Sequence, residues 1–232
     1  MAEKKYEGEK NSNGEKHGHG IEYSSNGVKF YEGQWENDKK SGIGTLFFPD
    51  GKIQYTGAWA NNIREGKGIQ YYFNGKPWYD GECVKGHRHG FGIEYDNNGI
   101  KEYEGAWLNG KRTGEGILYD DNGIRMYSGG FLNGKKEGWG INYFEDGRKL
   151  FEGNWKDNLR HGFGKVYKDK GEGVELEGNY HLGQLEGEGR IFHKNGKLYR
   201  EGTFVNGKLN GPGQEYWPNG KLKFDGAFKD DH

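Results

Sequence analysis

Several residues in this sequence have the chemistry and spacing that active or metal-binding sites use. Glutamates recur in the pattern Tyr-Glu-Gly, and paired carboxylates can perform acid–base catalysis. The pairs His17/His19 and His87/His89 each place two imidazoles on one side of an extended segment, as a metal site requires. The single cysteine, Cys83, would be reactive if a neighbouring cation stabilised its thiolate.

A structural explanation is simpler for each of these features. A catalytic carboxylate pair needs one desolvated setting, whereas the Tyr-Glu-Gly glutamates are repeated along the chain, as on a solvated charged face. Neither histidine pair has a third ligand beside it, and a lone cysteine is usually a small apolar filler. Gly-x-Gly segments also recur, but without the helix N-terminus of a dinucleotide site. We therefore expect no enzyme: no catalytic residue, no metal and no cofactor.

The composition favours a thin sheet over a globular domain. Glycine supplies 45 of 232 residues and proline only 4, while hydrophobic residues make up 31% and aromatic residues 16%. Such low hydrophobicity would suggest disorder, but disordered chains lack aromatic residues. The formal charge of -1 leaves no global field that would attract nucleic acid. The beginning of the chain has no signal-peptide pattern and one cysteine forms no internal disulfide, so we expect a cytoplasmic protein.

A repeat of 24 residues organises the elements that must position these side chains. An aromatic-x-Gly signature recurs in phase, with two steps of 25, at Gly8, Gly33, Gly57, Gly81, Gly105, Gly129, Gly153, Gly178, Gly202 and Gly226. A Gly-x-Gly follows each of the first nine, for example Gly114/Gly116 and Gly138/Gly140. Each repeat therefore contains two short elements separated by turns.

The turns predict β-hairpins. Asn109-Gly110 and Asn122-Gly123 each separate two strand-like runs, and Asn-Gly favours the type I′ turn because both central residues need positive φ. We predict two-residue loops at both positions, with Asp121 opposite Ile124. The predicted fold class is all-β: an elongated single-layer antiparallel β-meander of stacked 24-residue hairpin repeats, forming an open twisted ribbon.

Counting residues outward from such turns predicts the pairing of the strands. Gly105 is expected opposite Gly114, Gly116 opposite Gly129, and Gly114 opposite Phe131. These pairs predict one cross-strand row that consists of Tyr103, Gly116, Gly129, Gly138 and Trp155. Rings at the ends of such a row would fold over the bare glycines and restore their packing.

The segments YEGQW with GIGTLFF, YEGAW with GEGILY, and FEGNW with GFGKVY resemble MORN (membrane occupation and recognition nexus) repeats. The resemblance covers nearly the whole chain and implies an elongated antiparallel β-ribbon. It also implies roles in scaffolding, in cytoskeletal or ciliary assembly, and in membrane apposition. Bacterial antitoxin-like repeat proteins look similar, and an effector of that kind is an alternative.

Departures from the repeat predict its subdivisions within a single array, 1–232. A polar first repeat predicts an N-terminal cap over 1–30, followed by regular repeats over 31–170. An extra residue near Gly171 to Gly173 predicts a bulge or kink in an irregular repeat, 171–196, with C-terminal repeats and a cap over 197–232. Cys83 replaces the tryptophan of the fourth repeat, and Leu176 replaces the leading aromatic residue of the eighth.

Two surfaces are candidate binding sites. A single-layer sheet cannot cover both of its faces, so an aromatic stripe is predicted to dock a partner protein, as a peptide or helix, or a second copy as a homodimer. The stripe comprises Trp35, Trp59, Trp107, Phe131, Trp155, Tyr180 and Phe204. The alternative is weak, peripheral binding of phosphoinositides by a basic edge, which would give membrane association. That edge comprises Lys39, Lys40, Lys111, Arg112, Lys135 and Lys136.

Overall fold

A computed structural model describes residues 5–232, in which all regular secondary structure is β-strand. The chain divides into two compact units: unit 1 is 1–112 with 120–123, and unit 2 is 113–119 with 124–232. The strands of unit 1 are β1 (Tyr6–Lys10), β2 (Lys16–Tyr23), β3 (Lys29–Glu36), β4 (Lys39–Phe47), β5 (Ile53–Ala60), β6 (Ile63–Tyr71), β7 (Pro77–Val84), β8 (His87–Tyr95) and β9 (Lys101–Leu108).

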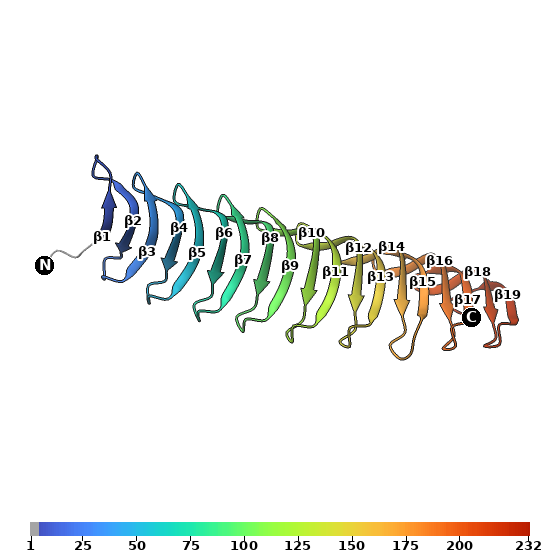
Figure 1. The fold of residues 1–232 in the computed structure, drawn as a ribbon. Coiled ribbons are helices and arrows are strands. Elements are labelled where there is room, and N and C mark those ends of the chain that lie inside the picture. Colours follow the sequence, from blue (N-terminus) through green and yellow to red (C-terminus); the bar gives the residue numbers. More distant parts are fainter. Residues whose placement is uncertain (1–4) are drawn as a thin grey trace. The chain divides into compact units, whose positions relative to one another are not determined.

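Unit 2 holds the remaining strands, beginning within β10. They are β10 (Lys111–Tyr119), β11 (Arg125–Leu132), β12 (Lys135–Tyr143), β13 (Lys149–Lys156), β14 (Leu159–Tyr167), β15 (Val174–His181), β16 (Gln184–Phe192), β17 (Leu198–Val205), β18 (Lys208–Tyr216) and β19 (Leu222–Phe228). Within each unit, every strand pairs antiparallel with the next one along the chain. Figure 1 shows these curved strands joined by tight turns. The predicted single-layer antiparallel meander of hairpins is therefore confirmed in both units.

The turn after the first strand of each repeat, named the first turn, has the predicted type I′ backbone. Asn109 and Gly110 have φ of 50° and 80°, and Asn133 and Gly134 have 52° and 86°. Leu132 pairs with Lys135, so the loop between them has two residues. A first turn also hydrogen-bonds to the start of the second strand of the preceding repeat, as when the Asn62 N–H donates to the Lys40 carbonyl at 3.0 Å.

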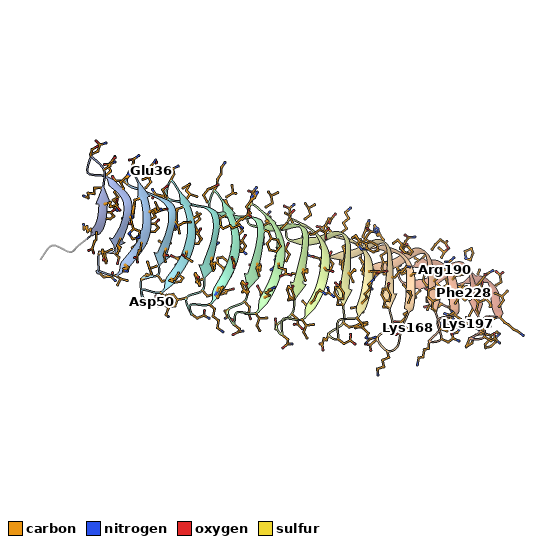
Figure 2. All side chains as sticks on the ribbon, viewed as in Figure 1. Glu36, Asp50, Lys168, Arg190, Lys197 and Phe228 are labelled. Carbon is orange, nitrogen blue, oxygen red and sulfur yellow. The ribbon has the colours of Figure 1, made fainter. Side chains whose placement is uncertain are left out.

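The turn after the second strand, named the second turn, is longer than predicted. Tyr119 pairs with Arg125, so Asp121 and Ile124 lie in the loop and do not pair. Of the loop residues, Gly123 alone has positive φ, 77°, and its N–H donates to the Asp120 carbonyl. The two-residue prediction was wrong because the chain closes a four-residue turn from Asp120 to Gly123, in which the glycine stands at the fourth position and its N–H reaches back to the first carbonyl. Figure 2 shows Glu36, beside a first turn, and Asp50, within a second turn, at opposite ends of the strands.

The glycines form one paired row in each unit. Gly116 pairs with Gly129 and Gly138 with Trp155, as predicted, and Gly114 with Phe131. Gly129, however, pairs with Gly140 rather than with Gly138. A bulge in β12, with Gly138 at φ 75°, places extra residues between Lys136, which pairs with Phe131, and Gly140. The predicted five-residue row is wrong at this step, whereas the predicted pairing of Gly105 with Gly114 stays a prediction. Within each unit, the second glycine of a Gly-x-Gly therefore pairs with the glycines on both sides of it, as Gly140 does with Gly129 and Gly153. In unit 1 this row comprises Gly8, Gly20, Gly33, Gly44, Gly57, Gly68, Gly81, Gly92 and Gly105.

Aromatic rings cover this row on one face, named the ring face, which carries Tyr31, Trp35 and their equivalents. A Cβ placed on Gly44 would lie 2.1 Å from the Tyr31 hydroxyl oxygen, so only glycine fits beneath the ring. Tyr31 contacts Trp35 of its own repeat and Trp59 of the next, edge to face, with ring centroids 5.0 and 5.5 Å apart. The rings thus form the interior that aliphatic residues form in other folds.

The extra residue near Gly171 to Gly173 lies in the second turn between β14 and β15, ahead of the first strand of the eighth repeat. Tyr167 pairs with Val174, and the Lys168 N–H donates to the Gly173 carbonyl at 3.2 Å across an enlarged loop. The register shift in β14 at Tyr167 is the one found in the other repeats. The prediction thus located the irregularity, but the loop absorbs the residue instead of a strand bulge.

Candidate partner-binding surface

The predicted aromatic stripe lies in the interior of the two units. Trp35, Trp59, Trp107, Phe131, Trp155, Tyr180 and Phe204 are all buried, with exposed fractions between 1% and 7%. The indole N–H groups of these tryptophans donate to backbone carbonyls of the sheet, as when Trp155 donates to the Gly140 carbonyl at 3.3 Å. Rings so placed present almost no area to a partner, and partner binding through them stays a prediction.

Three of the six residues of the predicted basic edge also lie on the ring face. Lys40 lies 5.1 Å from the centroid of the Tyr31 ring, Arg112 lies 4.9 Å from that of Tyr103, and Lys136 lies 4.5 Å from that of Tyr127. Each is the second residue after a first turn, so strand alternation directs it to the face opposite its neighbour.

Burial shapes the electrostatics of these cations. Burial lowers the pKa of Lys40 and of Lys136, because the charged ammonium loses water. Contacts with the electron-rich ring faces offset part of this loss. A lysine in this setting stabilises the ring stack and is poorly placed to reach a membrane.

The other three basic residues, Lys39, Lys111 and Lys135, are exposed beside first turns. Lys135 forms an ion pair with Asp157 at 2.7 Å, and the Lys39 ammonium donates to the Asn61 side chain at 3.4 Å. The structure therefore separates the predicted edge into two groups and does not bring its six cations together.

The opposite face, named the groove face, carries the residues that alternate with the glycines. Four of its large exposed apolar side chains stand at the middle of Gly-x-Gly, where both neighbouring glycines belong to the other face. In unit 1 they are Ile43 and Phe91, exposed by 63% and 60%. In unit 2 they are Trp139 and Phe163, exposed by 53% and 45%. Large apolar residues exposed at equivalent sites are typical of binding surfaces.

A groove of about 580 Å³ lies on this face in unit 2. Phe163 and Pro212 give it apolar walls, and Asn179 and Glu188 lie between them. The groove crosses strands β14 to β19, so that its long direction runs from repeat to repeat.

The lining of this groove is mainly acidic. It contains Glu177, Glu188, Glu201 and Asp225, but a single cation, Arg190. The Arg190 guanidinium lies 3.7 Å from Glu177 and 3.1 Å from Glu201, and it neutralises part of their charge. Glu188 instead accepts a hydrogen bond from the Thr203 hydroxyl at 3.0 Å, a neutral partner. The groove therefore favours a cationic ligand.

Unit 1 has a different hollow on its groove face, of about 510 Å³. His17, His19, Gln34 and Ser41 contribute to its lining, which has no exposed large apolar side chain. Across residues 5–232, no three His, Cys, Asp or Glu side chains are grouped so that they could hold a metal ion.

Cys83 is fully buried on the ring face, where other repeats have a tryptophan, phenylalanine or tyrosine. Burial raises the pKa of its thiol, and the Gln70 amide lies 3.8 Å from the sulfur. A raised pKa disfavours the thiolate, so this environment suits the apolar filler better than the reactive thiol.

The exposed residues of the groove face were missed in the sequence, although a pattern for them was present. The middle residue of Gly-x-Gly changes freely between repeats, as in Lys67, Phe91 and Trp139, while both glycines stay. A position that varies beside two residues facing the rings must itself face away from them. An apolar residue there marks surface rather than interior.

Comparison with known families assigns the repeats. The MORN repeat matches residues 6–29, 31–53, 55–76, 79–101, 103–125, 151–172 and 201–221, and a MORN repeat variant matches residues 185–206. No curated protein sequence matches the chain significantly. Within residues 5–232 there is no helix long and apolar enough to cross a membrane.

Proposed function

Because the chain belongs to the MORN repeat family, whose repeats are generally associated with protein or membrane binding, we propose that it is a non-catalytic protein-binding scaffold. The partner docks on the groove face. The observation that carries this proposal is the exposure of Trp139 and Phe163 at equivalent sites of unit 2. Two large rings exposed to water on a rigid sheet carry an unfavourable free energy of hydration, which a bound partner removes by burying them.

The charges support a protein partner over an anionic membrane. The groove beside Phe163 has four carboxylates and one guanidinium in its lining. Anionic headgroups would be repelled by such a surface. The ring-face cations that could attract them are Lys40, Arg112 and Lys136, which lie against rings.

Cross-linking and co-purification from cells would test the proposal. The double variant Trp139→Ser/Phe163→Ser should lose the partners that the natural chain retains. The matched control is Leu132→Ser/Leu159→Ser, which removes apolar side chains of similar exposure, 52% and 43%, at first turns. Circular dichroism would verify that both variants fold. An unchanged set of partners in the groove-face variant would refute the proposal.

A further inference from the structure

One row of side chains on the groove face of unit 2 alternates between rings and amides. Trp139 (β12) pairs with Asn154 (β13), Phe163 (β14) pairs with Asn179 (β15), and Glu188 (β16) follows. Register and alternation place all five on the same face, and all five are exposed. We name these residues the ring–amide row.

The spacing of this row suits one conformation of a bound peptide. Trp139 and Phe163 are two strands apart, as are Phe163 and Glu188, and two strands span about 9.6 Å. A polyproline II helix advances about 9.3 Å in three residues and returns every third side chain to the same side.

Other peptide conformations do not fit this spacing. An extended β-strand presents side chains on one side every ~6.7 Å. An α-helix presents them at ~5.4 Å per turn, or ~10.5 Å every seventh residue, which falls out of step by about 1 Å per repeat. A polyproline II segment that runs across the strands would stay in register over three successive sites.

The chemistry of the row also suits that conformation. Aromatic rings are the usual platforms for the prolines of such segments. The polyproline II backbone has no internal hydrogen bonds, so its carbonyls need donors. The Asn154 amide donates to the Phe163 carbonyl at 3.4 Å, whereas no described residue hydrogen-bonds to the side-chain amide of Asn179, which leaves its N–H groups available to a ligand.

The third site of the row calls for a cation. Glu188 has no ion pair with any residue of 5–232, and its hydrogen-bond partner is the neutral Thr203 hydroxyl. Glu177 and Glu201 also line the groove around it. A lysine or arginine three residues from the second proline would reach this carboxylate.

We propose that the ring–amide row binds a proline-rich polyproline II segment of a partner protein, with two prolines three residues apart and a basic residue three residues beyond. The two prolines stack on Trp139 and Phe163, and the basic side chain pairs with Glu188. This inference rests on the proposed function, because it names the class of partner that the groove face recognises.

Fluorescence anisotropy with labelled peptides and the full chain would test it. The probe carries prolines at two positions three apart and arginine three further on, in both chain directions. One comparison peptide has the same composition with a spacing of four, and another has arginines but no prolines. The probe in one of its two directions should bind at least about tenfold more tightly than either comparison peptide, a difference of about 1.4 kcal/mol. Equal binding of the peptides would overturn the inference.

Variants locate the site. Trp139→Ser/Phe163→Ser should weaken probe binding by about tenfold or more, a loss of at least ~1.4 kcal/mol. Leu132→Ser/Leu159→Ser should leave it unchanged. Glu188→Gln should reduce the dependence of binding on salt, since it removes the ion pair. Unaltered probe affinity in the double ring variant would overturn the inference.

The result is separable from that of the cellular experiment. If cross-linked partners depend on Trp139 and Phe163 but the probe does not bind, the scaffold proposal stands and the polyproline II inference fails. If neither depends on these residues, both fail.

Discussion

Trp139 and Trp155 lie on neighbouring strands of unit 2 and illustrate how its two faces differ. Trp155 is 6% exposed, contacts the Tyr127 ring edge to face with centroids 5.6 Å apart, and donates to the Gly140 carbonyl. Trp139 is 53% exposed. The same residue type thus serves as interior on one face and as surface on the other. In a sheet of one layer, the face of a residue decides its role more than its hydrophobicity does.

The largest expected effect is the loss of folding stability when the buried tryptophan is removed, compared with removal of the exposed one. Trp155→Ala should lower the free energy of unfolding by about 3 to 5 kcal/mol, because it leaves a cavity among rings. Trp139→Ala should change it by no more than about 0.5 kcal/mol, as surface substitutions do. Urea denaturation followed by circular dichroism measures both free energies. Similar midpoints for the two variants would contradict the assignment of Trp155 to the interior and Trp139 to the surface.

A smaller effect should follow from filling the glycine row. A Cβ on Gly140 would lie 2.2 Å from the Tyr127 hydroxyl oxygen, whereas one on Gly189 would lie 3.1 Å from the Phe204 ring. Gly140→Ala should therefore cost about 1 to 3 kcal/mol through overpacking, and Gly189→Ala less. Thermal unfolding of the two variants gives the comparison. A larger loss of stability in Gly189→Ala than in Gly140→Ala would show that the covering tyrosine is not what excludes a side chain from the glycine row.

The ring face should also respond to alkaline pH. Burial raises the pKa of Tyr55 from 10.0 to about 12, so the unfolded chain releases this proton first. The stabilisation is complete below pH 10 and is lost as pH rises from about 10 to about 12. Tyr55→Phe should reduce this loss because it removes one titrating hydroxyl, and the substitution should be tolerated because phenylalanine occupies the equivalent position at Phe151. Urea midpoints at pH 8 and pH 11 provide the measurement, and an identical fall in both proteins would contradict the assignment.

The smallest effect concerns a first turn, which belongs to neither face. Leu182 has φ of 49° and is 65% exposed, so it adopts a left-handed backbone and makes few contacts in return. Leu182→Asn should raise the free energy of unfolding by up to about 1 kcal/mol, because asparagine tolerates this conformation. The midpoint of urea denaturation should increase, and a decrease would mean that the leucine side chain packs more than its exposure indicates.

Much of the fold could be predicted because turns and alternation act locally. Asn109-Gly110 indicated a type I′ turn, and counting from turns placed Gly116 opposite Gly129. Counting failed between Gly129 and Gly138, because a bulge with positive φ leaves no mark in a pattern that already contains glycine.

The candidate site was harder to predict than the fold. The aromatic stripe follows from a repeat position that Trp155 shares with the other members, and a shared position does not tell whether its rings are buried or exposed. Lys136 was grouped with Lys135 by adjacency, although neighbours on a strand face opposite ways. The face of each residue depends on the register, and the register depends on bulges that the sequence pattern does not mark.

The paired glycine row leaves one side chain per repeat without a structural duty. At the middle of Gly-x-Gly, unit 1 has His19, Ile43, Lys67 and Phe91, while unit 2 has Glu115, Trp139, Phe163, Glu188 and Pro212. Substitution there changes the surface at intervals of about 9.6 Å and leaves the rings beneath undisturbed. Each of these positions can therefore be substituted separately from the others. The pattern of side chains along the groove face can change one position at a time while the fold stays the same.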